Sequence, residues 1–355
     1  MDYKSTLMWK ELNEAAAVLK TLAAKNEAAL AAIAADAKAA QVTNIYTAAR
    51  GTSDHAMIYF KYLVESKLGM PVASGAPSAV TMYGAKMRFK HTLVIGCSQS
   101  GKAADVMEIV KAGNECGAVT VAITNDADSP LAKLAKYHLC CCAGEEKSVA
   151  ATKTFTCQLY LSLLLADALG ADLNANGIGE MLEKAAAAVD KTTDGMAKDF
   201  IEAQECFILA RGLSSALAFE CGLKLQETCY IRSRAYHSSD FYHGPMAMVG
   251  KGTKVILFAS KHSLVPAMDE VHRADYIQCA KKMEELGADL YVITDDADSF
   301  QGIDAHIELV PGGGNEAETV FCFALTAQML ACKVSCGKGL SPDAPRALKK
   351  VTVTK

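Results

Sequence analysis

A glycine- and serine-rich segment at residues 96–102 is the first stretch of this sequence that could do chemistry. It reads Gly-Cys-Ser-Gln-Ser-Gly-Lys and follows an apolar run at 92–95 that predicts a buried strand. Backbone amides, the dipole of a helix opening at Lys102 and the hydroxyls of Ser98 and Ser100 could together hold a phosphate. Ser/Gly turns also cap many helices without binding a ligand, so both interpretations stay open here.

Two other polar segments could add hydroxyls to such a site. Thr52 and Ser53 follow the first predicted strand and could close the same pocket. The segment 144–154 contains Thr152, although a polar loop leading into a helix at 155–169 is its ordinary interpretation. In parallel α/β sheets ligands bind beyond the carboxyl ends of the strands, so the position of these loops favours binding.

Acid–base groups cluster in the second half of the chain. A helix expected at 216–229 carries Lys224 and Glu227 on one face, where they would ordinarily form a surface ion pair. In a dry cleft the same carboxylate could shuttle protons. A loop expected at 236–245 places His243 beside Gly-Pro, which indicates either a rigid turn or a proton donor near neutral pH.

The last residues of the chain hold a further candidate. Lys350 lies near the end, where lysines are usually solvated. Leu348 and Val351 flank it and could pin the segment into a cleft. There, desolvation and a neighbouring Lys224 would favour the neutral amine that attacks carbonyls.

Composition excludes several classes of protein. The chain has 355 residues, 51% of them hydrophobic, and a formal net charge of -4, which predicts about two domains and argues against nucleic-acid binding. The start lacks a secretory pattern, and the most apolar run, 159–165, is shorter than the roughly 20 residues of a membrane span. Thirteen cysteines show no disulfide or metal spacing. We therefore expect a cytoplasmic protein with reduced, mostly buried thiols, without a metal or membrane association.

An internal repeat sets the architecture. Residues 117–129 (GAVTVAITNDADS) and 287–299 (GADLYVITDDADS) are identical at eight of thirteen positions, and 46–53 echoes 207–215 in the same order. In both halves short apolar runs alternate with helical stretches, which predicts an α/β fold with two parallel sheets, each flanked by helices. Strands are expected at 44–48, 92–95, 119–124, 206–209, 254–259 and 289–294, and helices at 7–40, 54–67, 102–116, 130–135, 155–169, 178–204 and 216–229.

The order of these elements predicts five regions. A helical segment (1–40) precedes the first domain (41–177), a helical connector (178–205) leads to the second domain (206–335), and a tail (336–355) contributes to the active site.

Six ordered motifs give the chain a recognisable pattern. It resembles the double sugar-isomerase (SIS) domain family and, within it, the isomerase part of glucosamine-6-phosphate synthase. The motifs are ARGTS at 49–53, SQSG at 98–101, VAxTKxFT at 149–156, LKLxE at 223–227, HGP at 243–245 and the tail pattern PRxLxKxVT near 345–351. The resemblance implies two tandem SIS domains of flavodoxin-like, three-layer αβα architecture. Because the chain opens on the SIS-associated helix, we expect no glutaminase domain.

The resemblance also implies roles for individual residues. Glu227 would move a proton between C1 and C2 of the sugar, with Lys224 close to C1. His243 would open the sugar ring from a neighbouring subunit, so a homodimer is expected. Lys350 would contact the sugar carbonyl or form a Schiff base. The sugar phosphate would be bound by Ser98, Gln99, Ser100 and Thr52, with Ser53 nearby and Val149 contacting the sugar through its backbone.

Some positions depart from the synthase. Lys102 and Ala103 stand where it has Glu and a phosphate-binding Thr, Ala151 replaces a Ser, and Gln226 replaces a Lys. SIS-type glucosamine-6-phosphate deaminases match better at 50–56 and 144–153.

The function expected from this branch is conversion of glucosamine 6-phosphate into fructose 6-phosphate and ammonia, with no metal or redox cofactor. The alternative is a deglycase that splits a fructose- or glucose-amino-acid 6-phosphate, with Arg232 and Arg234 binding the carboxylate of the leaving group. A non-catalytic phosphosugar sensor is the third interpretation.

Overall fold

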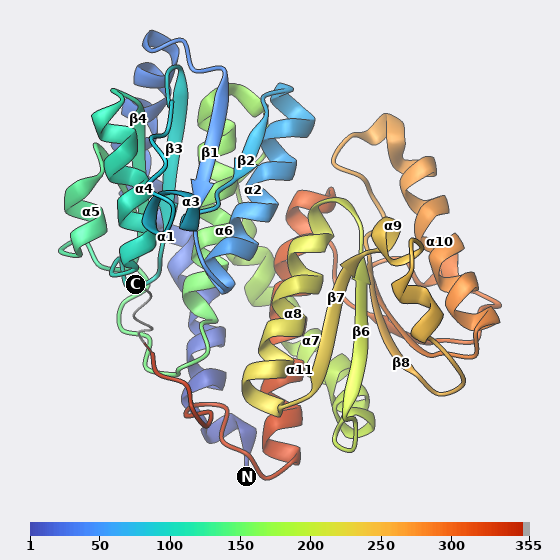
Figure 1. The fold of residues 1–355 in the computed structure, drawn as a ribbon. Coiled ribbons are helices and arrows are strands. Elements are labelled where there is room, and N and C mark those ends of the chain that lie inside the picture. Colours follow the sequence, from blue (N-terminus) through green and yellow to red (C-terminus); the bar gives the residue numbers. More distant parts are fainter. Residues whose placement is uncertain (351–355) are drawn as a thin grey trace. The chain divides into compact units, whose positions relative to one another are not determined.

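The computed structural model of the chain describes residues 1–350. The chain divides into two compact units, each built on one sheet (Figure 1). Unit 1 comprises residues 1–13, 147–152 and 180–348, and unit 2 comprises residues 14–146, 153–179 and 349–350. Each sheet has five strands and helices on both faces, which confirms the predicted α/β fold with two parallel sheets.

The sheet of unit 2 has the strand order β2-β1-β3-β4-β5, and every neighbouring pair is parallel. Strands β3, at the centre, and β4, beside it, are buried at every residue and mostly apolar, as a sheet covered on both faces requires. The strands are β1 (Asn44–Ala48), β2 (Val72–Ser74), β3 (Thr92–Cys97), β4 (Val119–Thr124) and β5 (Tyr137–Cys140).

Helices cover both faces of this sheet (Figure 1). On one face α4 and α5 bury Val106, Ile109 and Leu131 against Val94 and Ala122 of the central strands. On the other face α2 packs against α6. The helices are α2 (Thr52–Leu68), α3 (Ser78–Thr81), α4 (Ala104–Glu115), α5 (Pro130–Leu134) and α6 (Lys153–Ala166), which continues into a π-helical turn (Asp167–Ala171).

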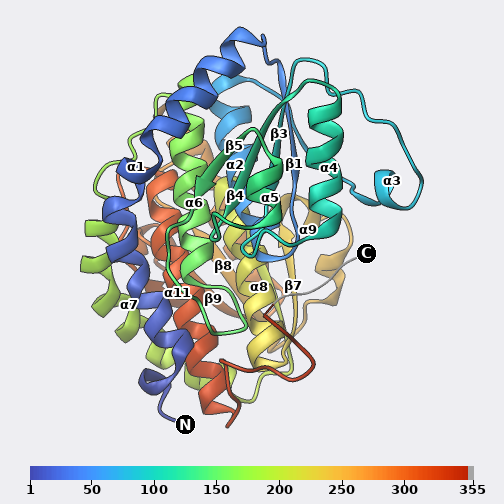
Figure 2. The ribbon, with the colours of Figure 1, turned by 90° about the vertical axis from the view of Figure 1, so that its left-hand side faces the viewer.

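The sheet of unit 1 has the parallel strand order β10-β9-β8-β6-β7. Helix α8 packs against α11 on one face (Figure 2), while Tyr276, Cys279 and Met283 of α10 pack on a core cluster that includes Leu257 and Val292. The elements are β6 (Glu205–Ala210), α8 (Ser215–Cys229), β7 (Arg232–His237), α9 (Ser238–Phe241), β8 (Lys254–Ala259), α10 (Asp269–Glu285), β9 (Asp289–Thr294), β10 (His306–Leu309) and α11 (Glu316–Gly337).

Two long helices complete the chain. Helix α1 (Leu7–Ala39) contributes its first residues to unit 1 and the rest to unit 2, and α7 (Ile178–Phe200) opens the chain's long run through unit 1. Both match the helical stretches expected at 7–40 and 178–204.

Sequence and structure differ at two segments near the motifs and at four strands. The helix after the serine loop begins at Ala104 rather than Lys102, because the chain first turns at Gly101. The segment expected to be a loop at 236–245 contains the end of β7 and the short helix α9. Four strands were not predicted, namely β2, β5, β7 and β10.

Two helices are long and apolar enough to cross a membrane, at Lys153–Ala171 and Glu316–Gly337. The first extends well beyond the apolar run at 159–165, so the length argument made from the sequence was wrong there. Their most apolar windows are 72% and 94% buried inside the protein, which is typical of core helices. The thirteen cysteines are free thiols and most are buried, which confirms that part of the prediction.

Candidate functional site

The serine loop leaves β3 at the carboxyl edge of the sheet of unit 2. Ser98 is buried, and its backbone N–H donates to the carbonyl of Ile123 on β4 at 3.0 Å. The loop then closes on itself, because the N–H of Gly101 donates to the carbonyl of Ser98 at 3.0 Å. Gly101 has φ +61°, and a Cβ there would lie 2.2 Å from Ser129 Oγ. Glycine is therefore the residue that allows this turn.

The polar side chains of the loop lie just before the start of α4. Gln99 and Ser100 are half-buried, and Lys102 is exposed. Ala103 occupies the N-cap position and has no side-chain acceptor to offer the first N–H groups of α4. A short, hydroxyl-bearing loop that leads into an N-terminus without a side-chain cap is an arrangement that can accept an anion.

An ion pair joins this loop to the one after β1. Arg50 Nε lies 2.7 Å from Asp105 Oδ2 in the first turn of α4, and the Asp105 side chain is only 4% exposed. Since β1 and β3 pair in parallel with Ala48 opposite Gly96, their carboxyl ends are adjacent. The structure thus brings the two predicted hydroxyl loops of unit 2 together.

Ser53 has a partner that sequence reasoning missed. Thr52 and Ser53 open α2 and are both buried. Gln158, on α6, donates from Nε2 to Ser53 Oγ at 3.1 Å. A serine hydroxyl that accepts this bond keeps its own proton for another acceptor. The only sequence signal for Gln158 was its place on the buried helix that follows the VAxTKxFT motif.

The remaining predicted ligands, Val149 and Thr152, belong to unit 1. The N–H of Val149 donates to the carbonyl of Asp343 at 3.0 Å. Thr152 is fully buried, and its carbonyl accepts from Gln328 Nε2 of α11 at 3.1 Å. The structure therefore groups these two residues with the acid–base helix α8 rather than with the serine loop.

The acid–base groups of α8 form a buried cluster in unit 1. Lys224 Nζ lies 2.5 Å from Glu227 Oε2 and 3.4 Å from Glu220 Oε1. Lys224 and Glu220 are fully buried, whereas the Glu227 side chain is 23% exposed. The expected surface ion pair was wrong: the pair forms, but with Lys224 fully buried, on a helix that packs against α11, β6 and β7.

Burial and the two carboxylates act in opposite directions on Lys224. Desolvation is the largest influence and lowers the pKa of its ammonium, yet Glu220 and Glu227 together outweigh it and raise that pKa. Lys224 is therefore a positive charge held beside Glu227. An ammonium so placed can orient a carboxylate for proton transfer.

His243 lies outside this cluster, on the surface of unit 1. It is exposed and follows α9, and its backbone N–H donates to the carbonyl of Asp240 at 3.1 Å. The next residue, Gly244, has φ 152°. Its supply to a neighbouring subunit stays a prediction.

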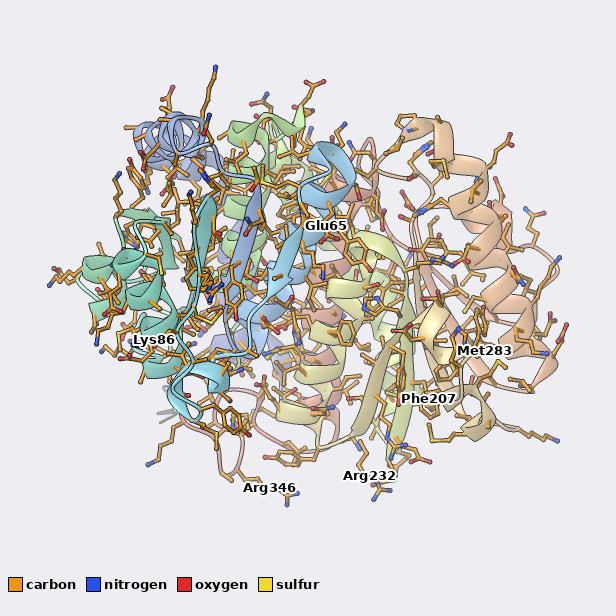
Figure 3. The ribbon with its side chains drawn as sticks, turned by 45° about the horizontal axis from the view of Figure 1, so that its top comes forward. Glu65, Lys86, Phe207, Arg232, Met283 and Arg346 are labelled. Atoms are coloured by element: carbon orange, nitrogen blue, oxygen red, sulfur yellow. The ribbon has the colours of Figure 1, made fainter. Side chains whose placement is uncertain are left out.

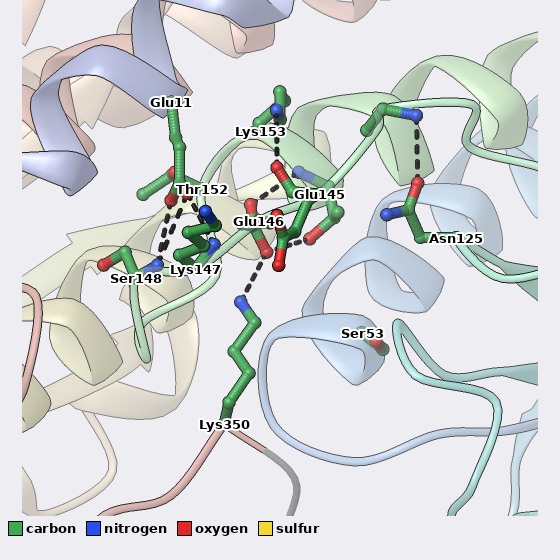
Figure 4. Close-up of polar contacts among 12 residues, drawn as sticks. Glu11, Ser53, Asn125, Glu145, Glu146, Lys147, Ser148, Thr152, Lys153 and Lys350 are labelled. Carbon is green, nitrogen blue, oxygen red and sulfur yellow. Dashed lines mark hydrogen bonds and ion pairs between the residues drawn. The ribbon is translucent and has the colours of Figure 1, made fainter.

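Lys350, the last described residue, lies in unit 2 and bonds to Glu146 Oε2 at 2.7 Å (Figure 4). The flanking residues do not behave as expected: Leu348 is 43% exposed rather than pinned in a cleft, and Val351 lies outside the described residues.

The equivalent loops of unit 1 are occupied by the protein's own carboxylates. Glu316, at the start of α11, accepts hydrogen bonds from the N–H and the hydroxyl of Ser214 at 3.0 and 2.9 Å. Asp295 Oδ1 accepts from the N–H of Lys261, after β8, at 2.6 Å. Burial is the largest influence on Glu316 and raises the pKa of its carboxyl group. The hydrogen bonds from Ser214 lower that pKa and the charge of Asp295 raises it, and the resulting pKa is about 7. Neither carboxylate stands out in the sequence by type or spacing.

The two arginines proposed for a leaving-group carboxylate lie on β7, an edge strand. Both are exposed, and Figure 3 shows Arg232 pointing outward from the molecule. Arg234 contacts the sulfur of Met248 through Nη1 at 3.1 Å. Neither forms part of the α8 cluster.

Within residues 1–350, no group of three or more His, Cys, Asp or Glu side chains could hold a metal ion.

The SIS domain family matches residues 38–168 and 199–336, one match for each half of the repeat. The chain belongs to this family. Glutamine–fructose-6-phosphate aminotransferase [isomerizing] of Legionella pneumophila (strain Lens) is 32% identical over 321 residues, covering 88% of this chain and 51% of that protein. The chain spans about half the length of the curated relatives it matches.

Solved structures of SIS proteins share the fold. A candidate phosphosugar isomerase from Silicibacter pomeroyi DSS-3 is 29% identical, covers 95% of this chain and all of its own, and superposes with a TM-score of 0.83. Glucosamine-6-phosphate deaminase from Thermotoga maritima is 20% identical, covers 98% of this chain and 100% of its own, and has a TM-score of 0.77. The predicted relationship to the isomerase part of the synthase is confirmed.

Proposed function

We propose that this SIS protein acts on a 6-phosphorylated amino sugar, converting glucosamine 6-phosphate and water into fructose 6-phosphate and ammonia. The observation that carries the proposal is the cluster on α8. Of its three charged groups, Glu220 and Lys224 are fully buried and Glu227 alone is partly exposed. A carboxylate that a buried ammonium holds in place, and that is still partly exposed, is suited to general acid–base catalysis.

The loops of unit 2 supply the second requirement, a place for the phosphate. Ser98, Gln99, Ser100, Thr52 and Ser53 offer hydroxyl and amide groups next to two helix N-termini. In the proposal these residues bind the phosphate of the sugar. The first turns of these helices also carry Asp54 and Asp105, and Asp105 is paired with Arg50. The name of the Legionella relative, an isomerizing aminotransferase of fructose 6-phosphate, supports a hexose 6-phosphate and an amine as reactants.

The chemistry proceeds through the opened sugar. His243, donated by the second subunit of a proposed homodimer, opens the ring. Glu227 then carries a proton from C2 to C1, which converts the aldose amine into a ketose imine. Water adds at C2 and displaces ammonia, leaving fructose 6-phosphate. The Lys224 ammonium keeps Glu227 in position during the transfer, and the tail lysine, Lys350, contacts the sugar carbonyl.

A product assay tests the proposal and separates it from the deglycase. The purified chain is incubated with glucosamine 6-phosphate, with ammonia and fructose 6-phosphate measured together, and in parallel with fructose- and glucose-amino-acid 6-phosphates, with free amino acid measured. We expect equimolar ammonia and fructose 6-phosphate from the first substrate. Amino-acid release alone would assign the deglycase reaction, and binding without turnover of any substrate would assign a sensor.

A further inference from the structure

Glu146 occupies an unusual position for a carboxylate. Its side chain is fully buried, and it lies eight residues before Thr154 in the polar segment that leads into α6. Oε1 accepts from the N–H of Thr154 at 3.0 Å, and Oε2 accepts from the hydroxyl of Thr154 at 2.8 Å. Both oxygens are thereby oriented by the first turn of α6, where a negative charge is stabilised by the helix dipole.

Lys350, in the C-terminal segment, contacts this carboxylate. Residues 346–349 are exposed, whereas Lys350 turns inward and its side chain is 23% exposed. Lys350 Nζ lies 2.7 Å from Glu146 Oε2, a contact between residues 204 positions apart (Figure 4). The neighbouring cation, Lys153, is engaged elsewhere, with Glu14 Oε2 at 2.6 Å and the carbonyl of Glu145 at 3.2 Å.

We propose that Glu146 is the positioning residue of the tail lysine, seating the C-terminal segment through this ion pair so that Lys350 acts as a fixed positive charge. The inference rests on the proposed function, in which Lys350 serves the sugar carbonyl. It also chooses between the two roles that the sequence left open. An amine must be unprotonated to form a Schiff base, whereas the salt bridge with Glu146 engages Lys350 as a cation.

A purely structural role for Glu146, as a cap of α6, would need Thr154 but not Lys350. The two roles can be separated because the cap and the ion pair use different partners of the same carboxylate. Thr154→Val removes the hydroxyl contact and leaves Lys350 its partner. Glu146→Gln removes the charge that holds Lys350 and keeps an amide oxygen for the helix.

The decisive measurement is amine acetylation of the intact protein, quantified at each lysine by mass spectrometry. Lys349 is exposed and adjacent, so it provides the internal reference. In the wild type we expect Lys350 to react about tenfold more slowly than Lys349, a ratio that corresponds to about 1.4 kcal/mol of protection. Glu146→Gln should abolish the difference and Thr154→Val should preserve it. Equal reactivity of the two lysines in the wild type would overturn the proposal without any variant having to fold.

Kinetics on the amino-sugar phosphate supply a second readout. Glu146→Gln and Lys350→Met should each lower kcat about tenfold with KM nearly unchanged, and the double variant should be no worse than either single one, since both remove the same contact. Borohydride treatment with fructose 6-phosphate should leave Lys350 unmodified. A trapped adduct at Lys350, or full kcat in Glu146→Gln, would refute the fixed-charge role. If the wild type turns over no amino-sugar phosphate, the proposed function fails while the acetylation result still decides how the tail is seated.

Discussion

Corresponding loops of the two halves of the repeat have different hydrogen-bond partners. Asn125 in unit 2 and Asp295 in unit 1 occupy matching positions of the repeated segments 117–129 and 287–299. Asn125 bonds to backbone, donating to the carbonyl of Gly144 at 2.7 Å and accepting from the N–H of Ala143 at 2.9 Å. Asp295 instead accepts from the N–H of Lys261, in the loop that corresponds to the serine loop.

The loops after the first strand of each sheet differ in the same sense. Ser53 of unit 2 is bonded by the neutral amide of Gln158, whereas Ser214 of unit 1 is bonded by the carboxylate of Glu316. In unit 1 the loop donors are therefore satisfied by internal carboxyl groups, which take the hydrogen bonds that an external phosphate would need. In unit 2 the compared partners, Asn125 and Gln158, are neutral amides. The corresponding loops are thus bonded by amides in unit 2 and by carboxyl groups in unit 1.

The largest effect is expected at the carboxylate assigned to proton transfer. Glu227→Gln keeps the shape of the side chain and removes its basicity, so turnover should fall roughly 10²–10⁴-fold while phosphosugar affinity is nearly preserved. Solvent deuterium should enter C1 of the product in the wild type. Near-normal turnover by the variant would show that the α8 cluster is structural only.

A carboxylate placed in unit 2 at the position that matches Asp295 should remove this difference between the two halves. Asn125→Asp places a negative charge beside the serine loop, where Asn125 N–H donates to the carbonyl of Gln99 at 3.0 Å. Repulsion of a phosphate dianion should weaken phosphosugar binding roughly 100-fold, measured by calorimetry. The reverse change, Asp295→Asn, should leave affinity as it is. Equal effects of both changes would mean that the halves do not differ in this way.

A pair of serine deletions gives a smaller, sharper test. Ser100→Ala removes one hydroxyl from the proposed phosphate loop, and the loss of a charge-assisted hydrogen bond should cost about 1.5–3 kcal/mol of binding. Ser260→Ala removes the hydroxyl after β8, which contacts His272 Nε2 at 2.9 Å. Its affinity for the sugar phosphate should equal that of the wild type. Unchanged affinity in Ser100→Ala would move the phosphate away from this loop.

The smallest effect concerns stability and pH. Because the pKa of Glu316 is raised in the folded state to about 7 from its ordinary 4.5, the folded protein holds this proton longer than the unfolded chain does. Stability should therefore fall as pH rises from about 4.5 to about 7 and stay level above that, by at most about 3 kcal/mol. Glu316→Gln should lack this slope. Urea unfolding of both proteins at pH 5 and pH 8 measures the difference, and parallel profiles would contradict it.

The central strands could be predicted because their information is local. β1, β4, β8 and β9 have the bounds expected from their apolar runs. The four strands that were missed, β2, β5, β7 and β10, are the edges of the two sheets. Edge strands are short or partly polar, so their pattern resembles that of a loop until a neighbouring strand supplies hydrogen-bond partners.

The sequence by itself determined the duplication, the alternation of strands and helices, and the residue types of the motifs, since these follow from composition and period. Only the tertiary structure decided which polar groups meet. Lys224 and Glu227 read as a surface pair until packing buried that face of α8, and Glu146 had no visible partner because Lys350 lies 204 residues away. The charge state and contacts of a buried group depend on what the fold places around it, and that is not encoded in any one stretch of the chain.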